Sequence, residues 1–259
     1  MALAPFLEKV MADLRAEDAL LVMAKGLGLH VVLHQLVAAH AAPEHLVLVL
    51  NASQEEERQL LHGLAVSGVG GTPPVVITNE CSAADRVELY LAGGVLLVTS
   101  RILVVDMLSD RVPVEQLSGI VVANAHRVSE SSNVAFIMRL YRQRNRHGFI
   151  KALSDDAHGF TRGFAKVEKV MRLLHVRRLH LWPRFHVEVA GALDGCAPQV
   201  DEVSVPLSAR AARLQRALLE AVETCLAELR YAYARACVCI CIYTERLLEA
   251  VETCLAELR

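Results

Sequence analysis

Short runs of apolar residues alternate with segments of helical periodicity between residues 19 and 182. The runs consist mainly of Leu, Val, Ile and Ala without regular polar alternation, which predicts strands buried on both faces of a sheet. Because helical segments separate the runs, the pattern indicates an α/β domain whose parallel sheet is flanked by helices, with its ligand edge at the carboxyl ends of the strands. The predicted strands are residues 19–24, 45–50, 74–78, 94–99, 120–123, 148–153 and 178–182, and the predicted helices are residues 30–40, 53–64, 100–108, 133–144 and 166–174.

The C-terminal part of the chain repeats itself. Residues 218–230 (LLEAVETCLAELR) recur without change at residues 247–259, and two copies are too few for a solenoid. The spacer, residues 231–244, reads YAYARACVCICIYT. Its successive residues can be encoded alternately by pyrimidine–purine–pyrimidine codons and by purine–pyrimidine–purine codons, as in a translated dinucleotide repeat. We therefore interpret residues 231–259 as an aberrant tail, which transcript reads across Arg230 would test. The alternative is a real edge strand, because Cys-Val-Cys-Ile-Cys-Ile also suits a strand.

Composition and charge narrow the class of protein. The chain has 259 residues, 54% hydrophobic and 22% charged, so it can bury a sizeable core. Its net charge of −2 excludes a globally basic nucleic-acid-binding protein but not a local basic face. Residues 1–18 lack a secretory-signal pattern, and the most apolar stretch, residues 19–39, is interrupted by Lys25, two glycines and two histidines. We expect an intracellular protein without a membrane partner, whose cysteines are reduced; four of the seven lie in the suspected tail.

The first predicted strand is followed by a glycine-containing turn where a nucleotide-binding domain would hold phosphates. A working phosphate loop, G-x-x-x-x-G-K-[ST], needs backbone N–H groups around the phosphates, a lysine for the β- and γ-oxygens and a hydroxyl for Mg²⁺. The chain has Gly26 and Gly28, but Leu29 and His30 stand where the lysine and the hydroxyl residue belong, and Lys25 precedes the turn. By itself this motif favours a plain tight turn over a phosphate site.

A second motif follows the strand at residues 120–123. A helicase-type ATPase carries Asp-Glu-Ala-His there, where Asp holds Mg²⁺ through water and Glu polarises the attacking water. Here the two acidic positions are Ala123 and Asn124, and His126 remains. Alanine cannot bind a metal and asparagine cannot act as a base at neutral pH. The defects in both motifs together predict a degenerate, inactive ATPase.

A basic run without an acidic residue spans residues 139–151. One interpretation is a solvated helix end, whose cations complement the helix dipole. The other is a surface that contacts phosphates, for which the guanidinium fork of arginine is suited. Sequence leaves both open, and the candidate DNA-binding residues are Arg139, Arg142, Arg144, Arg146 and Lys151.

No motif predicts catalysis or a metal site. A second cationic stretch, residues 172–186, contains histidines without a zinc-ligand spacing. The patterns G-x-S-x-G, H-E-x-x-H and Cys-x-x-Cys do not occur. We therefore expect no catalytic residue, no metal ligand and no cofactor in this chain.

Four segments carry a resemblance to a known family: residues 93–110 (GGVLLVTSRILVVDMLSD), the Ala125-His126-Arg127 remnant, residues 136–151 (FIMRLYRQRNRHGFIK) and residues 181–187 (LWPRFHV). They resemble the N-terminal helicase-like region of the XPF family, the catalytic subunits of structure-specific DNA-repair endonucleases. The resemblance extends from about residue 5 to residue 230. It implies a RecA-like domain of the superfamily 2 helicase type with decayed ATPase motifs, and a helical C-terminal extension.

The resemblance also implies a domain organisation. Residues 1–187 would form the degenerate helicase-like domain, residues 188–230 the start of a linker or helical region, and residues 231–259 the aberrant tail. An active helicase carries its third motif, usually Ser-Ala-Thr-like, at the position of Ser154, Asp155 and Asp156. The chain therefore lacks the usual residues of this motif as well.

Members of the XPF family cut DNA at double-strand/single-strand junctions in nucleotide excision repair and crosslink repair, which implies a nuclear protein. They act with a smaller, inactive partner subunit and use Mg²⁺ or Mn²⁺ in a nuclease domain that carries the motif E-R-K-x-x-x-D. The chain does not contain this motif. We therefore interpret the chain as an early-truncated member, and we do not expect it to bind the smaller subunit, which docks on C-terminal elements.

Three hypotheses follow. The first is a noncatalytic module that binds DNA junctions and repair scaffold proteins. The second is a protein-interaction scaffold without DNA affinity. The third, the least favoured by the two defective motifs, is a working ATP-dependent helicase lobe.

Overall fold

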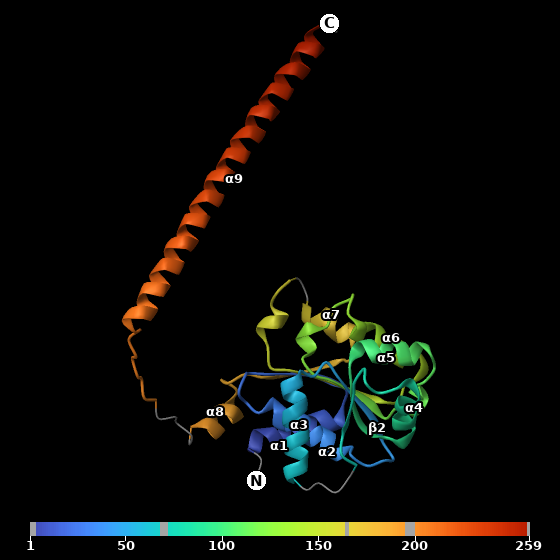
Figure 1. Ribbon diagram of the computed structural model, residues 1–259. Coiled ribbons are helices and arrows are strands. Elements are labelled where there is room, and N and C mark those ends of the chain that lie inside the picture. Colours follow the sequence, from blue (N-terminus) through green and yellow to red (C-terminus); the bar gives the residue numbers. More distant parts are fainter. Residues whose placement is uncertain (1–3, 68–71, 164–165, 195–199, 258–259) are drawn as a thin grey trace. The chain divides into compact units, whose positions relative to one another are not determined.

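The computed structural model describes residues 4–67, 72–163, 166–194 and 200–257, which fall into two compact units that divide after residue 197. The first unit is built on a seven-stranded sheet (Figure 1), in which all strand pairs are parallel and the order is β3-β4-β2-β5-β6-β1-β7. The strands are β1 (Ala19–Met23), β2 (Leu46–Leu50), β3 (Val75–Ile77), β4 (Gly94–Val98), β5 (Gly119–Val122), β6 (Phe149–Ser154) and β7 (Arg178–Trp182). Each strand overlaps the apolar run that predicted it, which confirms the parallel α/β fold.

Helices cover both faces of this sheet (Figure 1). They are α1 (Pro5–Ala16), α2 (Leu29–Ala39), α3 (Gln54–Ser67), α4 (Ala83–Ala92), α5 (Ser100–Leu108), α6 (Asn133–Arg144), α7 (Lys166–Leu173) and α8 (Val187–Leu193), with short 3-10 turns η1 (Val114–Gln116), η2 (Ala125–Arg127) and η3 (His158–Phe160). The five predicted helices are confirmed. Helices α1, α4 and α8 were not among the predicted elements.

The core consists of two layers separated by the sheet. Alternate strand residues point to opposite faces, so Leu20 and Val22 pack in a layer with helices α4 to α7. Leu21 and Met23 pack in the other layer, with helices α1, α2, α3 and α8. Because both faces are covered, the middle strands are buried at every position, as their apolar runs predicted.

Local chemistry defines where two of these helices begin. Helix α3 follows the predicted capping box: the Glu56 N–H donates to Ser53 Oγ at 3.3 Å, and the Ser53 N–H donates to Glu56 Oε2 at 2.7 Å. Helix α4 has a second capping box, between Ser82 and Asp85, that the sequence analysis did not identify. Such reciprocal pairs satisfy backbone N–H groups that have no partner inside the helix.

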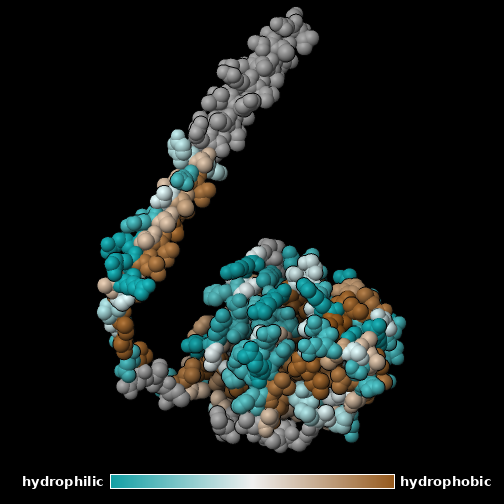
Figure 2. All heavy atoms as spheres, in the orientation of Figure 1, coloured by the Kyte–Doolittle hydropathy of each residue, from teal (hydrophilic) through white to brown (hydrophobic). Residues whose placement is uncertain are grey.

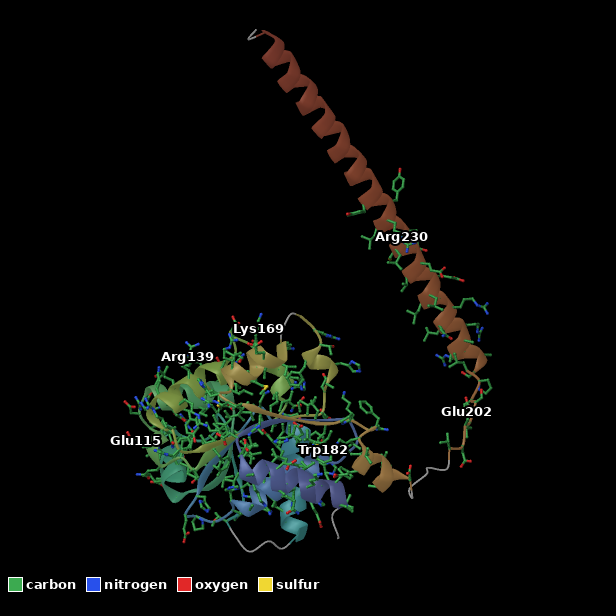
Figure 3. All side chains as sticks on the ribbon, turned by 180° about the vertical axis from the view of Figure 1, so that it is seen from behind. Glu115, Arg139, Lys169, Trp182, Glu202 and Arg230 are labelled. Atoms are coloured by element: carbon green, nitrogen blue, oxygen red, sulfur yellow. The ribbon has the colours of Figure 1, made fainter. Side chains whose placement is uncertain are left out.

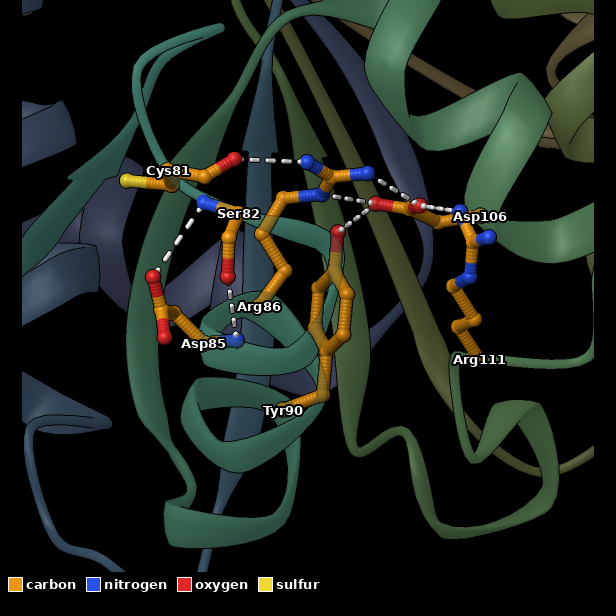
Figure 4. Close-up of polar contacts among 7 residues, drawn as sticks. All are labelled: Cys81, Ser82, Asp85, Arg86, Tyr90, Asp106 and Arg111. Atoms are coloured by element: carbon orange, nitrogen blue, oxygen red, sulfur yellow. Dashed lines mark hydrogen bonds and ion pairs between the residues drawn. The ribbon is translucent and has the colours of Figure 1, made fainter.

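A buried carboxylate ties helix α4 to helix α5 (Figure 4). Asp106 is fully buried and accepts hydrogen bonds from Arg86 Nε at 2.7 Å and Arg86 Nη2 at 2.8 Å. The Tyr90 hydroxyl and Arg111 Nη1 donate to the same carboxylate, at 3.1 and 3.2 Å. Burial by itself raises the pKa of the Asp106 carboxyl, but these donors outweigh it and hold the pKa below its usual range.

The boundary of the first unit lies beyond the predicted residue 187. Helix α8 begins at that position and belongs to the unit, because Val189 is buried in the layer that contains α1 and Glu188 pairs with Lys9 of α1. The compact unit consequently extends to residue 197.

The second unit contains one long helix, α9 (Ala209–Glu257), whose side chains are described up to Tyr233. The expected helical extension is therefore present. The alternative of an edge strand in residues 231–244 is wrong, because the backbone there continues α9. Among the described residues, no helix is both long enough and apolar enough to cross a membrane.

Candidate functional site

Loops from four neighbouring strands meet at the carboxyl edge of the sheet. The order β2-β5-β6-β1 places the ends of these strands side by side, and residues after them line a pocket of about 350 Å³. A pocket at this edge is what a parallel sheet predicts. Six of the seven predicted vestigial positions line it: Gly26, Gly28, Leu29, His30, Ala123 and Asn124.

The turn after β1 contains two glycines with positive φ but lacks the lysine and hydroxyl side chains of a working phosphate loop. Gly26 and Gly28 have φ values of +84° and +87°, and Gly28 is the N-cap of α2. Leu29 and His30 begin the helix without a lysine or a hydroxyl side chain. Arg184 Nη2 donates to the carbonyl of Lys25 at 2.8 Å, and a Cβ on Gly26 would lie 3.2 Å from the same nitrogen. The guanidinium therefore packs against the outside of this turn.

Asn124 and Glu56 line the pocket, and Asn51 forms hydrogen bonds with Asn124. Asn51 Nδ2 donates to the carbonyl of Asn124 at 3.1 Å, and Asn124 Nδ2 donates to the carbonyl of Asn51 at 3.3 Å. Asn124 Nδ2 also lies 2.7 Å from Glu56 Oε2, which accepts from Ser53 as well. Both asparagines have the left-handed backbone that this residue type tolerates. The Asn124 carboxamide thus has a structural partner at a position where an active ATPase needs a base.

The remaining vestigial residue, His126, lies beside the pocket in η2. Its Nδ1 is 2.9 Å from the hydroxyl of buried Ser154, and its Nε2 is 3.9 Å from Asp156. Burial lowers the pKa of His126 more than the Asp156 carboxylate raises it. This contact joins the Ala-Asn-Ala-His corner to the Ser-Asp-Asp segment after β6.

These residues do not suit Mg²⁺ and a nucleoside triphosphate. Ala123 presents a methyl group in place of a metal-holding carboxylate. The described residues that line the pocket include the carboxylates Glu56 and Asp155, and none of these described residues is a lysine or arginine. Within the part of the chain that the structure describes, no three His, Cys, Asp or Glu side chains form a metal-binding group. The described lining residues therefore lack the lysine that a working phosphate loop directs at the β- and γ-oxygens.

The predicted basic strip divides into two kinds of residue. Arg142 donates to Asp18 Oδ2 at 2.7 Å and to the Gly148 carbonyl at 2.6 Å. Lys151 is buried, donates to the Glu17 carbonyl at 2.5 Å and lies 3.6 Å from Asp18 Oδ1. Burial lowers the pKa of Lys151 despite the neighbouring Asp18. These two cations hold the start of β1 against β6, so their first role is structural.

The other cations of the strip are exposed. Arg139 is exposed on α6, and Lys169 is exposed on α7, a helix in contact with α6 (Figure 3). Arg144 pairs with Asp110 at the surface, and Arg146 is exposed in the turn before β6. Burial lowers the pKa of His175, which follows α7, and the positive charges of Arg142 and Arg139 lower it further. The folding of the chain has therefore brought the two basic stretches of the sequence together.

Comparison with known proteins connects this geometry to a family. No family model matches the chain. The chain is 45% identical over 232 residues to DNA repair endonuclease XPF of Cricetulus griseus, covering 88% of the chain and 25% of the relative. It is 37% identical over 230 residues to DNA repair endonuclease XPF of Drosophila melanogaster, covering 89% and 23%. The chain belongs to the XPF family. It spans about a quarter of the length of these relatives.

Solved structures support the fold of this XPF-family chain. The Hef helicase domain of Pyrococcus furiosus matches it with a TM-score of 0.60 at 19% identity, covering 72% of the chain and 39% of that domain. At this identity the likeness concerns the fold alone, a parallel sheet flanked by helices as in that helicase domain. The predicted fold class is confirmed.

Three residues that contact the predicted site residues were missed in the sequence. Glu56 was identified only as half of a capping box, and Asn51 and Asp18 received no role. Their partners lie 68, 73 and 124 residues away in the chain, at Asn124 and Arg142. A local motif does not reveal such partners. The one available signal was an acidic residue, Glu56, close after a buried strand end.

Proposed function

We propose that the chain is a noncatalytic DNA-repair module that binds double-strand/single-strand junctions and repair scaffold proteins in the nucleus. The observation that carries the proposal is the hydrogen bond from Asn124 to Glu56. Asn124 stands where an active ATPase has its catalytic base, and this bond gives it a structural role there. Membership of the XPF family supports the DNA substrate, and the exposed cations of the basic strip supply a surface for phosphates.

The absence of ATP binding is tested by calorimetric titration with MgATP. We expect no measurable heat, because the described lining residues of the pocket include the carboxylates Glu56 and Asp155 and no lysine or arginine to hold the phosphates. A dissociation constant in the micromolar range would overturn this part of the proposal and favour a working helicase lobe.

DNA binding is tested by its salt dependence on a splayed junction. Replacing Arg139 and Arg146 by alanine should lower the slope of log K against log salt by about 1.8, because each phosphate contact contributes about 0.9. The matched control replaces Arg15 of α1 and Arg58 of α3, which are exposed on the other face of the sheet and remove the same charge.

An alternative function is a protein scaffold without DNA affinity. It is favoured by the observation that Arg142 and Lys151 are engaged with Asp18 and the Glu17 carbonyl. Absence of binding to the splayed junction would favour the scaffold, and a slope that the strip variant leaves unchanged would show that the exposed arginines do not contact DNA phosphates.

A further inference from the structure

Strand β7 lies at one edge of the sheet. Among the described residues it pairs with no strand except β1, and the Trp182 carbonyl accepts from the Ala24 N–H at 3.0 Å. Because the backbone groups of successive strand residues point to opposite sides, the N–H and C=O groups of Leu179 and Leu181 point away from β1. Edge groups of this kind are a template for a further strand.

The two leucines are also exposed through their side chains. Trp182 is buried in the layer that contains α1 and α8, and Leu179 and Leu181 point to the opposite face of the sheet. On that face their neighbours on β1, Leu20 and Val22, are buried under helices, whereas Leu179 and Leu181 are 36% and 58% exposed. The layer of helices therefore ends before β7.

The apolar surface continues beyond the strand. Phe185 and Val187, which lead from β7 into α8, are 86% and 84% exposed. Figure 2 shows brown, apolar surface where α8 lies in Figure 1. Single exposed apolar residues are ordinary on a protein surface, but here they adjoin backbone groups that point away from the sheet. This combination favours a partner that is itself an extended strand.

An arginine stands at each end of this edge. Arg177 precedes β7, Arg184 follows it seven residues later, and both side chains are exposed. No described acidic side chain forms an ion pair with either of them, whereas Arg178 pairs with Glu17. Residues 172–187 contain no acidic residue. The edge therefore favours a segment with an acidic residue near each end and apolar residues between them.

We propose that β7 is a docking site for an extended segment of a partner protein, which adds to the edge that faces away from β1. Apolar residues at alternate positions of the segment pack beside Leu179 and Leu181, and its acidic ends pair with Arg177 and Arg184. The proposal rests on the partner-binding part of the proposed function, whose class of partner it identifies, and it does not depend on DNA binding.

Two other occupants fit this edge less well. Antiparallel pairing of two copies of β7 would bring the end with Arg177 and Arg178 of one copy to the end with Arg184 of the other, so like charges would meet. DNA phosphates would suit the arginines, but they would leave the leucines and the backbone carbonyl groups between them without partners. An acidic and apolar peptide strand satisfies all of these groups together.

Fluorescence anisotropy of a labelled synthetic peptide tests the docking on the full chain. The probe is Asp-Val-Thr-Val-Thr-Val-Thr-Asp, whose valines share one side and whose acidic residues have the spacing of the two arginines. We expect saturable binding, and binding about tenfold weaker for the control peptide with Lys in place of both Asp residues. Equal binding of the two peptides would overturn the proposal, as would no binding of the acidic one.

Charge reversal on the chain tests the ends of the edge. Arg177→Glu combined with Arg184→Glu should weaken the acidic peptide about tenfold and strengthen the lysine peptide. The matched control, Arg58→Glu with Arg101→Glu, lies on the helices after β2 and β4, which at least three strands separate from β7, and should change neither. Circular dichroism verifies that both double variants keep the first unit folded.

Binding of the splayed junction, measured on the same samples, separates this proposal from the DNA-binding part of the proposed function. We expect the Arg177 and Arg184 variant to bind the junction as the matched control does. A variant that loses the junction but keeps the peptide would assign both arginines to DNA and overturn the docking site. Failure of the wild type to bind DNA, with the acidic peptide still bound, would leave the docking site standing.

Backbone methylation of the probe tests the strand addition itself. In an added strand alternate N–H groups point to β7 and the others point away. One peptide carries N-methyl groups on its valines and another on its threonines, and we expect one of them to bind about tenfold more weakly and the other within about threefold of the probe. Amide hydrogen exchange should slow at Leu179 and Leu181 when the probe binds. Equal effects of the two methylations, or unchanged exchange at both leucines, would contradict strand addition.

Discussion

Asn124 Nδ2 lies 2.7 Å from Glu56 Oε2, although the two residues are 68 positions apart in the chain. The contact joins the corner after β5 to the first turn of α3. The same glutamate oxygen accepts from the Ser53 N–H, so one carboxylate caps the helix and holds the Asn124 carboxamide. An amide suits this position because it can donate to Glu56, which a carboxylate cannot do.

Asn124→Asp should therefore destabilise the chain and restore no ATPase activity. It places a carboxylate beside Glu56 in a largely buried position, and the expected loss is about 1–3 kcal/mol at pH 7. Repulsion raises the pKa of the pair in the folded state, so the loss develops as the pH rises through that pKa and is smaller at pH 4. Urea unfolding at pH 4, 5 and 7 measures it.

Glu56→Gln provides the matched control for this substitution. Combined with Asn124→Asp, it lets the new amide donate to the new carboxylate, so the double variant should recover part of the lost stability. If the two effects simply add, the Asn124–Glu56 contact does not couple the two residues, and the proposed structural role of Asn124 is contradicted.

Arg142→Ala should act on stability, and Arg139→Ala on DNA binding. Arg142 is mostly buried and bridges Asp18 to the Gly148 carbonyl, so its removal should cost about 1–3 kcal/mol. Arg139 is exposed, and its removal should change stability by less than about 0.5 kcal/mol. Denaturant unfolding and junction binding, measured on both variants, separate the roles; equal stability losses would contradict them.

Asp106→Asn should lower stability by about 2–4 kcal/mol at neutral pH, because it leaves the mostly buried Arg86 without its carboxylate. The pKa of Asp106 is lowered by folding, so its contribution is present above the ordinary value of 3.8 and is lost as the pH falls through the lower folded value. The gap between wild type and variant should thus narrow below pH 3.8. Asp110→Asn, at an exposed ion pair, is the control and should have little effect.

His126 should titrate below its ordinary pKa of 6.5, because burial disfavours the imidazolium. As the pH falls below 6.5, the unfolded chain takes up this proton first, so stability decreases. NMR titration, with the signal assigned by loss in His126→Gln, measures the midpoint. Asp156→Asn should lower it further by removing a nearby carboxylate. A midpoint above 6.5 would contradict the buried environment.

Much of the fold could be predicted because the relevant signals are local. The strands are apolar at successive positions, and the capping box at Ser53 lies within four residues. Helix α1 was missed although its signal is present: Pro5 stands at the first turn, and Phe6, Val10 and Leu14 share a buried face. Helix α4 was missed as well, although the capping box at Ser82 is equally visible in the sequence.

The candidate site was only half predictable. The replaced residues Leu29, His30, Ala123 and Asn124 could be identified because the motifs they interrupt have fixed spacing. The contacts that these replacement residues make could be identified only from the fold. Glu56 reaches Asn124 only because β2 and β5 are neighbours in the sheet.

By itself, the sequence determined the class of fold and the replacement of residues in the two ATPase motifs, since both depend on residue type and short-range spacing. Tertiary structure alone decided which cations of the basic strip are exposed. Arg142 and Arg139 are three residues apart and chemically identical, yet one faces Asp18 and the other faces solvent. The difference arises because residues one turn apart on α6 meet different neighbours once the helix packs against the sheet, and no local pattern contains those neighbours.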